Sequence, residues 1–318
     1  MLNNIYPKCG NNFRQWYKSH PKWELFYKYL GNPKPFDVTL RDGLQGLSLS
    51  QQNVFTLEEK KDLYHSIICD HKPKYMEIGS IVSEKLLPIF KDSIDLHKYV
   101  EKQQRLENKR EPIDFFLLVP NQRQMQKIIN NYLIHNFSFI TSMSNSFHFK
   151  NTKMTLEEGD KDIDNMITLL DINTERCNDA KIKLYISCVN YCPFEGIIDN
   201  DFIVHRLLQL NRKKVDILCL SDTCGTLTCD DFEYIVDTCF YFGIPYSKFA
   251  LHLHVNYGKE IEVEKIIHKA LDRKIINFDV SLLDSGGCSI TIPKDKLLPN
   301  LSYDLYYKSL VNYIKRKT

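Results

Sequence analysis

The sequence lacks the features that mark a membrane, secreted or nucleic-acid-binding protein. No window approaches the roughly 18 to 20 uninterrupted apolar residues of a bilayer span, and no charged start followed by an apolar core marks a secretory signal. An excess of cations is also missing, because 42 Lys and Arg residues face 40 Asp and Glu residues. Neutralising a phosphate backbone needs such an excess. We therefore expect neither a membrane nor a nucleic acid as partner.

The ten cysteines lack the close, regular spacing of a disulfide-stapled domain. Neither Cys188/Cys192 nor Cys224/Cys229 has the two-residue gap of a zinc knuckle. Reduced thiols fit this pattern, so we expect a cytoplasmic protein. The patterns G-x-G-x-x-G and G-x-x-x-x-G-K-[ST] are absent as well, which removes the usual dinucleotide and P-loop interpretations.

Residues 1–34 form an aromatic segment that differs from the rest of the chain. It contains both tryptophans, Trp16 and Trp23, and has no acidic residue before Glu24. We predict a helical arm packed on the main domain, which would then comprise residues 35–318. A transit peptide is the alternative, although the segment is not rich in Arg and Ser as such peptides are.

From residue 35 onward, short β-branched or aromatic runs alternate with longer amphipathic stretches. Such alternation predicts parallel strands separated by helical crossovers. Eight units over about 250 residues favour an α/β fold of the (β/α)8 TIM-barrel type over an open doubly wound sheet. The eight runs are Phe36–Leu40, Tyr75–Ile78, Phe115–Val119, Phe137–Thr141, Leu184–Val189, Val215–Leu220, Phe249–His254 and Ile275–Leu282.

Polar residues at the ends of two predicted strands suggest a metal site. The first strand runs into Arg41 and Asp42, and the seventh ends in His252 and His254. Alternation along a strand sends both imidazoles to the same side, and active sites of such barrels lie at the carboxyl ends of the strands. A carboxylate with two imidazoles and no thiolate suits Mg²⁺ or Mn²⁺.

Two further strand ends supply candidates for proton transfer. The sequence Asp284-Ser285-Gly286-Gly287-Cys288 follows the last strand, and its Gly-Gly step is flexible enough to carry a thiol into a site. Glu77 lies in the second strand, where a carboxylate beside the barrel interior needs a partner. A simple turn at the glycines and a purely orienting Glu77 are the alternatives.

The segments Arg41-Asp42-Gly43-Leu44-Gln45, His252-x-His254 and Gly286-Gly287-Cys288 together resemble 3-hydroxy-3-methylglutaryl-CoA lyase. This family belongs to a superfamily of metal-dependent lyases and Claisen synthases that share the barrel. Ser187–Gly196 and Glu77–Ser83 also resemble lyase segments, and the similarity extends from about Phe36 to Leu305.

The resemblance implies a retro-Claisen cleavage of 3-hydroxy-3-methylglutaryl-CoA to acetyl-CoA and acetoacetate. It implies a divalent metal bound by Asp42, His252, His254 and Asn300, with Arg41, Asp42, Glu77, His252 and Cys288 as catalytic residues. It further implies an acyl-CoA substrate contacted by Arg41, Gln45, Asp222, Thr223, Gly286 and Gly287. A homodimer is one option for the assembly.

Departures from the family pattern keep two other functions open. Val255-Asn256 follows the histidine pair, and Ser289-Ile290-Thr291 follows Cys288 where the family has a proline and an aromatic residue. Substrate fit is the property most exposed to such changes. A lyase or synthase acting on another acyl-CoA or 2-oxo acid is therefore one alternative, and a non-catalytic binding relative is the other.

Overall fold

The computed structural model describes residues 35–107, 112–173, 179–287 and 290–317. The predicted arm of residues 1–34 and the predicted catalytic residue Cys288 lie outside the described residues. No helix of the described ranges is long and apolar enough to cross a bilayer.

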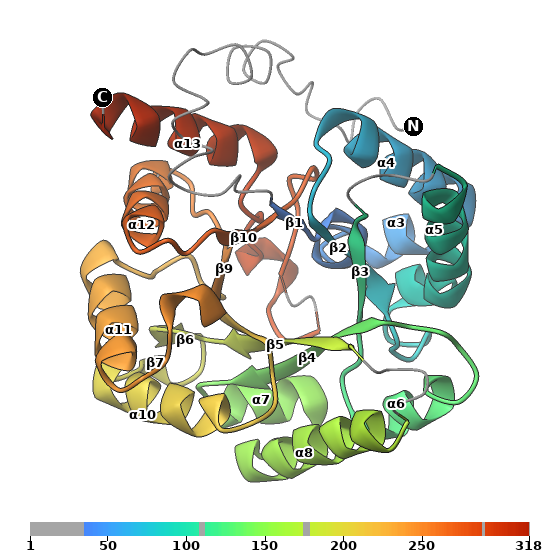
Figure 1. The fold of residues 1–318 in the computed structure, drawn as a ribbon, viewed down its shortest axis with the longest axis horizontal. Helices are drawn as coiled ribbons and strands as arrows, with labels where there is room; N and C mark the ends of the chain where they lie inside the picture. The colour runs from blue at the N-terminus through green and yellow to red at the C-terminus, as the bar shows by residue number, and fades with distance from the viewer. Residues whose placement is uncertain (1–34, 108–111, 174–178, 288–289, 318) are drawn as a thin grey trace.

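Eight parallel strands form a closed barrel, which confirms the predicted fold (Figure 1). The first strand, β1, closes the barrel because Phe36 pairs with Tyr75 of β2 on one side and with Asp279 of β10 on the other. Neighbouring strands follow the order β1 (Phe36–Asp37), β2 (Tyr75–Ser80), β3 (Asp114–Leu118), β4 (Asn136–Ser142), β5 (Lys181–Ser187), β8 (Ile217–Asp222), β9 (Phe249–Leu253) and β10 (Asn277–Val280). A short antiparallel pair, β6 (Tyr191–Cys192) and β7 (Gly196–Ile197), lies outside the barrel sheet.

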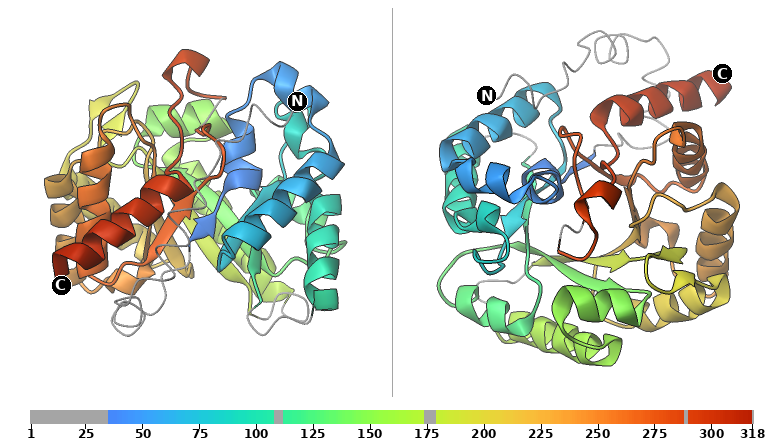
Figure 2. Two further views of the ribbon diagram at one scale, coloured as in Figure 1. Left: turned by 90° about the horizontal axis from the view of Figure 1, so that it is seen from above. Right: turned by 180° about the vertical axis from the view of Figure 1, so that it is seen from behind.

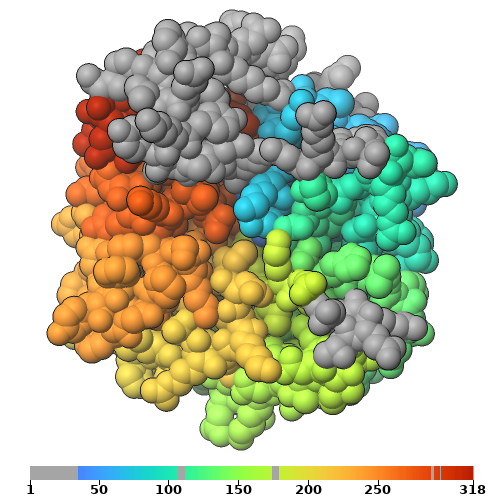
Figure 3. Space-filling view, in the orientation of Figure 1, coloured from blue at the N-terminus to red at the C-terminus, as the bar shows by residue number. Residues whose placement is uncertain are grey.

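Helices surround the barrel and follow one another around it in chain order (Figure 1), and the colours of the molecular surface run around the molecule in the same order (Figure 3). Hydrogen-bonding side chains begin several of them: Thr56 and Thr155, for example, start α4 and α8 with complete capping boxes. The helices are α3 (Leu49–Val54), α4 (Leu57–Asp70), α5 (Ser93–Glu107), α6 (Gln122–Ile128), α7 (Asn145–Thr152), α8 (Leu156–Ile172), α10 (Asn200–Asn211), α11 (Cys229–Tyr241), α12 (Glu260–Asp272) and α13 (Tyr303–Lys317).

The first strand is shorter than predicted. It ends at Asp37, and Thr39–Gly43 form a π-helical turn, η2, in place of the expected strand through Leu40. The Asp37 carboxylate accepts hydrogen bonds from the backbone N–H and the hydroxyl of Thr39, at 3.0 and 2.8 Å. These local bonds compete with strand pairing and turn the backbone into η2.

The end of β9 and the apolar face of α12 also differ from the sequence prediction. Strand β9 ends at Leu253, so His254 lies just past it, in an isolated antiparallel bridge with Asn300. In α12, the apolar face predicted from Ile261 to Leu271 is buried, except that Ile261 itself is 73% exposed.

The barrel interior is apolar at one level and charged at the next. Phe36, Tyr75 and Phe116 pack together near the start of the strands. Closer to the carboxyl ends, Glu77, Lys183 and Asp279 are fully or almost fully buried. The segment after β10, which includes the short helix η5 (Lys294–Lys296), lies across the barrel opening (Figure 2, right). The buried charged residues therefore lie inside the barrel, below the opening that the segment after β10 covers.

Candidate metal centre and cavity

Asp42, His252 and His254 come together at the carboxyl ends of the strands, as the sequence predicts. One ligand atom from each lies within 4.8 Å of the others, and all three residues are buried. The Nε2 atom of His252 lies 3.2 Å from Nε2 of His254 and 3.8 Å from Oδ2 of Asp42. This is a set of hard and borderline donors that suits a divalent cation.

Each histidine is held through its other nitrogen. The Nδ1 atom of His254 donates to the carbonyl oxygen of Leu298 at 3.0 Å, and Nδ1 of His252 faces a carboxylate oxygen of Asp279 at 2.9 Å. Burial, together with the neighbouring His252, lowers the pKa of His254 to about 4, so this ring is neutral at pH 7. Because each Nδ1 atom is engaged by its own partner, the two Nε2 atoms are turned toward each other. Such an arrangement could hold a metal ion.

Asn300, the predicted fourth ligand, lies beside His254. Its backbone forms a bridge with His254, and its Nδ2 donates to the carbonyl oxygen of Ser285 at 3.1 Å. Its Oδ1 is buried and has no hydrogen-bond partner among the described residues. A buried amide oxygen without a partner is costly, and a cation beside it would satisfy it. The residues present therefore fit a divalent metal.

The π-helical turn η2 positions Arg41 between two carboxylates. Its Nε contacts Glu77 and its Nη1 contacts Asp42, while its Cζ lies 4.9 Å from the centre of the Tyr185 ring. Burial alone would lower the pKa of Arg41, but the two carboxylates raise it well above its usual value. The guanidinium therefore stays charged at the end of β1.

Asp42 stays ionised for a related reason. Burial alone would raise its pKa, but Arg41 and the two histidines lower it well below the usual range. Its Oδ2 also accepts a hydrogen bond from the backbone N–H of Gly287 at 2.8 Å. This bond ties the loop after β10 to the turn after β1.

The two glycines of that loop allow close approaches. Gly287 has a φ angle of +90°, which disfavours other residues. A Cβ atom on Gly286 would lie 2.4 Å from Nδ2 of Asn300, so Gly286 leaves the space that Asn300 occupies. Cys288, the next residue, is outside the described ranges.

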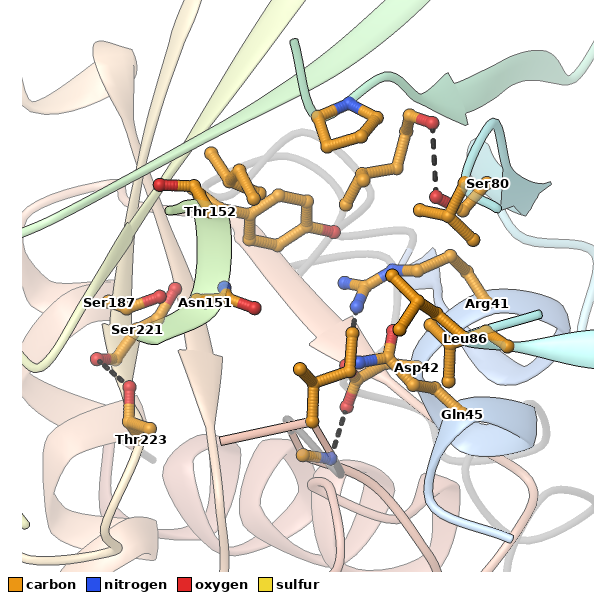
Figure 4. A pocket seen from close by; sticks show the side chains of 18 of the residues that line it. Arg41, Asp42, Gln45, Ser80, Leu86, Asn151, Thr152, Ser187, Ser221 and Thr223 are labelled. Atoms are coloured by element: carbon orange, nitrogen blue, oxygen red, sulfur yellow. Dashed lines mark hydrogen bonds and ion pairs between the residues drawn. The ribbon is translucent and has the colours of Figure 1, made fainter. Parts of the chain in front are cut away.

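A cavity of about 380 Å³ opens above these residues (Figure 4). Arg41, Asp42 and Gln45 line one side, and Ser187, Ser221 and Thr223 line the opposite wall. His252, His254 and Gly287 also line it. Of the residues predicted to contact substrate, Arg41, Gln45, Thr223 and Gly287 thus face one cavity, with Gly286 packed behind.

Four predicted site residues within the described ranges do not line this cavity, namely Glu77, Asp222, Gly286 and Asn300. The Asp222 carboxylate accepts hydrogen bonds from the backbone N–H groups of Thr226 and Leu227, at 2.9 and 3.1 Å. These bonds support the loop after β8, and the substrate contact of Asp222 stays a prediction from the sequence. Glu77 lies behind Arg41 and accepts from the hydroxyl of Tyr185 at 3.0 Å. In this place it orients Arg41, and a catalytic role of Glu77 stays a prediction from the sequence.

The sequence analysis missed Asp279, Lys183 and Tyr185, which surround the site from inside the barrel. The ammonium of Lys183 contacts Asp279, the residue that holds His252. A signal was available for Asp279, a charged residue within the predicted strand Ile275–Leu282, whereas Lys183 precedes the predicted strand Leu184–Val189. Residues of that kind are rarely buried without a partner.

No family model matches the chain. It is 26% identical over 266 residues to the hydroxymethylglutaryl-CoA lyase YngG of Bacillus subtilis, and the match covers 80% of each protein. The chain is hydroxymethylglutaryl-CoA lyase-like. It is a carbon–carbon lyase with a TIM-barrel fold.

Solved structures agree on the fold. The Bacillus subtilis HMG-CoA lyase matches with a TM-score of 0.71 at 22% identity, over 91% of this chain and 93% of that one. An HMG-CoA lyase from Acinetobacter baumannii, in complex with coenzyme A and 3-methylmalate, matches with a TM-score of 0.70 at 19% identity, over 89% and 83%. Both likenesses cover most of this chain.

Proposed function

We propose that the chain cleaves 3-hydroxy-3-methylglutaryl-CoA to acetyl-CoA and acetoacetate with a divalent metal, Mg²⁺ or Mn²⁺. Asp42, His252, His254 and Asn300 would hold the ion. The observation that carries the proposal is the pair of facing Nε2 atoms 3.2 Å apart, next to Asp42 and to the unpartnered Oδ1 of Asn300. Arg41 adjoins this donor set at the floor of the cavity.

A bound divalent ion acts as a Lewis acid and lowers the pKa of a coordinated hydroxyl group. In the proposed reaction, a base removes the proton of the substrate's tertiary hydroxyl group. A ketone then forms at that carbon as the carbon–carbon bond breaks. The electron pair of the broken bond passes to the thioester fragment as an enolate, which then takes up a proton to give acetyl-CoA.

Arg41 is suited to stabilise the enolate oxygen. Glu77 and Asp42 hold its guanidinium from two sides, so little reorganisation is needed as negative charge develops. Proton transfer by Cys288 remains a prediction from the sequence, because this residue is outside the described ranges.

The charges around the cavity support an anionic substrate such as an acyl-CoA. Lys150 and Lys153, from the end of α7, line it together with Arg41. Among the described lining residues, Asp42 has the one carboxylate, and Arg41 and the histidines surround it. Two lysines at the rim would attract the phosphates of a CoA chain.

Removing these lysines tests that role. The double variant Lys150→Met/Lys153→Met should raise KM for the acyl-CoA about tenfold and leave kcat nearly unchanged, because binding outside the reacting centre is lost. Steady-state kinetics at low and high salt measure both constants. Lys161→Met, on the exposed face of α8, is the matched control. A fall in kcat with unchanged KM would contradict a binding role.

The proposed function is tested by acetoacetate release from 3-hydroxy-3-methylglutaryl-CoA, with Mn²⁺ or Mg²⁺ and again with a chelator. Metal-dependent release is the expected result. Metal binding without turnover would favour another acyl-CoA or 2-oxo acid as substrate. Absence of both would favour the non-catalytic alternative.

A cytoplasmic location, expected from the cysteine spacing, belongs to the same proposal. Cell fractionation with an antibody to the chain tests it, and recovery with an organelle would contradict it.

A further inference from the structure

Lys183 is a fully buried lysine inside the barrel, and it does not line the substrate cavity. It lies on β5, two residues before Tyr185, so both side chains point inward. Its Nζ donates to Oδ1 of Asp279 at 2.5 Å and to the hydroxyl oxygen of Tyr185 at 2.9 Å, and lies 3.4 Å from the centre of the Phe36 ring. Burial of an unpaired ammonium raises the free energy of the folded state, and these partners offset that penalty.

One branch of contacts leads from Lys183 to the candidate metal centre. Asp279 accepts from Lys183 with Oδ1, and its Oδ2 faces Nδ1 of His252 at 2.9 Å. With both oxygens engaged, the carboxylate has one orientation. That orientation fixes the ring of His252 and leaves its Nε2 pointing at His254.

The other branch leads to Arg41. The hydroxyl of Tyr185 accepts from Lys183 and donates to Oε2 of Glu77 at 3.0 Å. The same carboxylate oxygen accepts from Nε of Arg41. One ammonium therefore supports two chains of hydrogen bonds that end at the two charged parts of the site.

We propose that Lys183 is a positioning residue that holds His252 through Asp279 and Arg41 through Tyr185 and Glu77. An ammonium can donate up to three hydrogen bonds, so it serves both branches at once, which an apolar residue of equal length cannot do. The inference rests on the proposed function for what the two ends do. Its first branch can be measured without substrate.

The first test compares the Mn²⁺ affinity of Lys183→Met with that of the unchanged chain by isothermal titration calorimetry. Loss of a residue that orients a ligand should weaken binding about 10- to 100-fold. Lys60→Met is the matched control, because Lys60 is 2% exposed and pairs with Asp92 and the carbonyl of Ile89, on the outer helices. It should lose comparable stability and keep its Mn²⁺ affinity. Equal Mn²⁺ affinity in the two variants would overturn the proposal.

Two further variants separate the branches and cover the case in which Lys183→Met does not fold. Asp279→Asn should weaken Mn²⁺ binding, whereas Tyr185→Phe should keep Mn²⁺ affinity and lower kcat with little change in KM. If Lys183 acts through Asp279, the double variant Lys183→Met/Asp279→Asn should bind Mn²⁺ no more weakly than the weaker single variant. Fully additive losses, or unchanged affinity in Asp279→Asn, would refute this route.

These outcomes differ from those that refute the proposed function. An unchanged chain that binds Mn²⁺ without cleaving the substrate refutes the proposed reaction and leaves the affinity comparison valid. Cleavage by the unchanged chain, with full Mn²⁺ affinity in Lys183→Met, refutes the role of Lys183 alone.

Discussion

Arg41 shows how a single residue of this site depends on its neighbours. Its guanidinium is 5% exposed and lies between the carboxylates of Asp42 and Glu77. A buried cation without these carboxylates would destabilise the fold, and so would the two buried carboxylates without the cation. Arg41 and its two carboxylates therefore stabilise one another in their charged forms, and the guanidinium beside the cavity stays positively charged.

Replacement of Arg41 tests its contribution to the reaction. In Arg41→Met, kcat should fall about 10²- to 10³-fold, as is typical when a group that stabilises an oxyanion is lost. Arg41→Lys should lie between this variant and the unchanged chain, because lysine cannot contact two carboxylates with a rigid fork. Steady-state kinetics with saturating Mn²⁺ provide the measurement. A kcat equal to that of the unchanged chain would count against the assignment.

His148 affords a test of pH dependence away from the metal centre. Burial between α7 and α8 lowers its pKa to about 4, from a usual value of 6.5. Between these pH values the unfolded chain binds a proton at this residue and the folded chain does not, so the free energy of unfolding falls as the pH falls. The residue contributes up to about 1.4 kcal/mol per pH unit in this window.

The variant His148→Gln should accordingly show a smaller loss of stability between pH 6.5 and pH 4. Urea unfolding at several pH values, compared between the two chains, isolates this residue from other titrating groups. Parallel curves for the two chains would contradict the prediction.

Among the elements, the loop after β10 contacts the candidate ligands Asp42, His254 and Asn300. Gly287 donates to Asp42, Gly286 packs against Asn300, and Leu298 accepts from His254. Residues 286–287 and 298 of this loop therefore support ligands of which two, Asp42 and His254, come from other parts of the chain. The conformation of this loop should affect metal binding more than it affects overall stability.

Gly286→Ala examines that expectation. Its Cβ would come within 2.4 Å of Nδ2 and 2.7 Å of Cγ of Asn300, which must then move. Mn²⁺ affinity, measured by calorimetry, should fall about tenfold or more. Gly243→Ala is the control, because it has a φ of +96° and no atom within 4 Å of the added Cβ. The control should lose about 1 kcal/mol of stability and keep its Mn²⁺ affinity; the same effect in both variants would contradict the prediction.

At the scale of the whole molecule, the site joins the segment after the first barrel strand to the segment after the last one. Gly287 and Asp42 are 245 positions apart and hydrogen-bonded. Tyr303, at the start of α13, donates to Asp37 of β1 at 2.7 Å and reinforces the same closure. A ligand that bridges these parts binds the folded chain and not the unfolded one, so it should stabilise the entire barrel.

Metal should therefore raise the melting temperature. At a free Mn²⁺ concentration of about 100 times Kd, the expected stabilisation is about 2.7 kcal/mol, and a chelator should remove it. Asp42→Ala should melt at the same temperature with Mn²⁺ as with chelator. Differential scanning calorimetry measures these shifts; an unchanged melting temperature for the wild-type chain would refute the metal site.

Much of this architecture is predictable from local patterns. Alternating apolar runs and amphipathic stretches predict eight strands and their helices, because burial of one face imposes a period on the sequence. The two-residue spacing of His252 and His254 predicts that they share a side, and the structure confirms it. The first strand was predicted too long, because the bonds from Asp37 to Thr39 compete with pairing in a way that a run of strand-forming residues does not reveal.

Local sequence thus determines the helices and strands, the faces that they bury, and which polar residues stand at the strand ends. Tertiary structure alone decides which of these residues meet. Lys183 and Asp279 are 96 positions apart, and their contact depends on closure of the barrel and on the register of its strands. Likewise, Asp222 carries a suitable carboxylate, yet the backbone of its own loop takes up both oxygens. The physical reason is that a buried charge is stable only with a partner, and only the folded barrel brings the partners within reach.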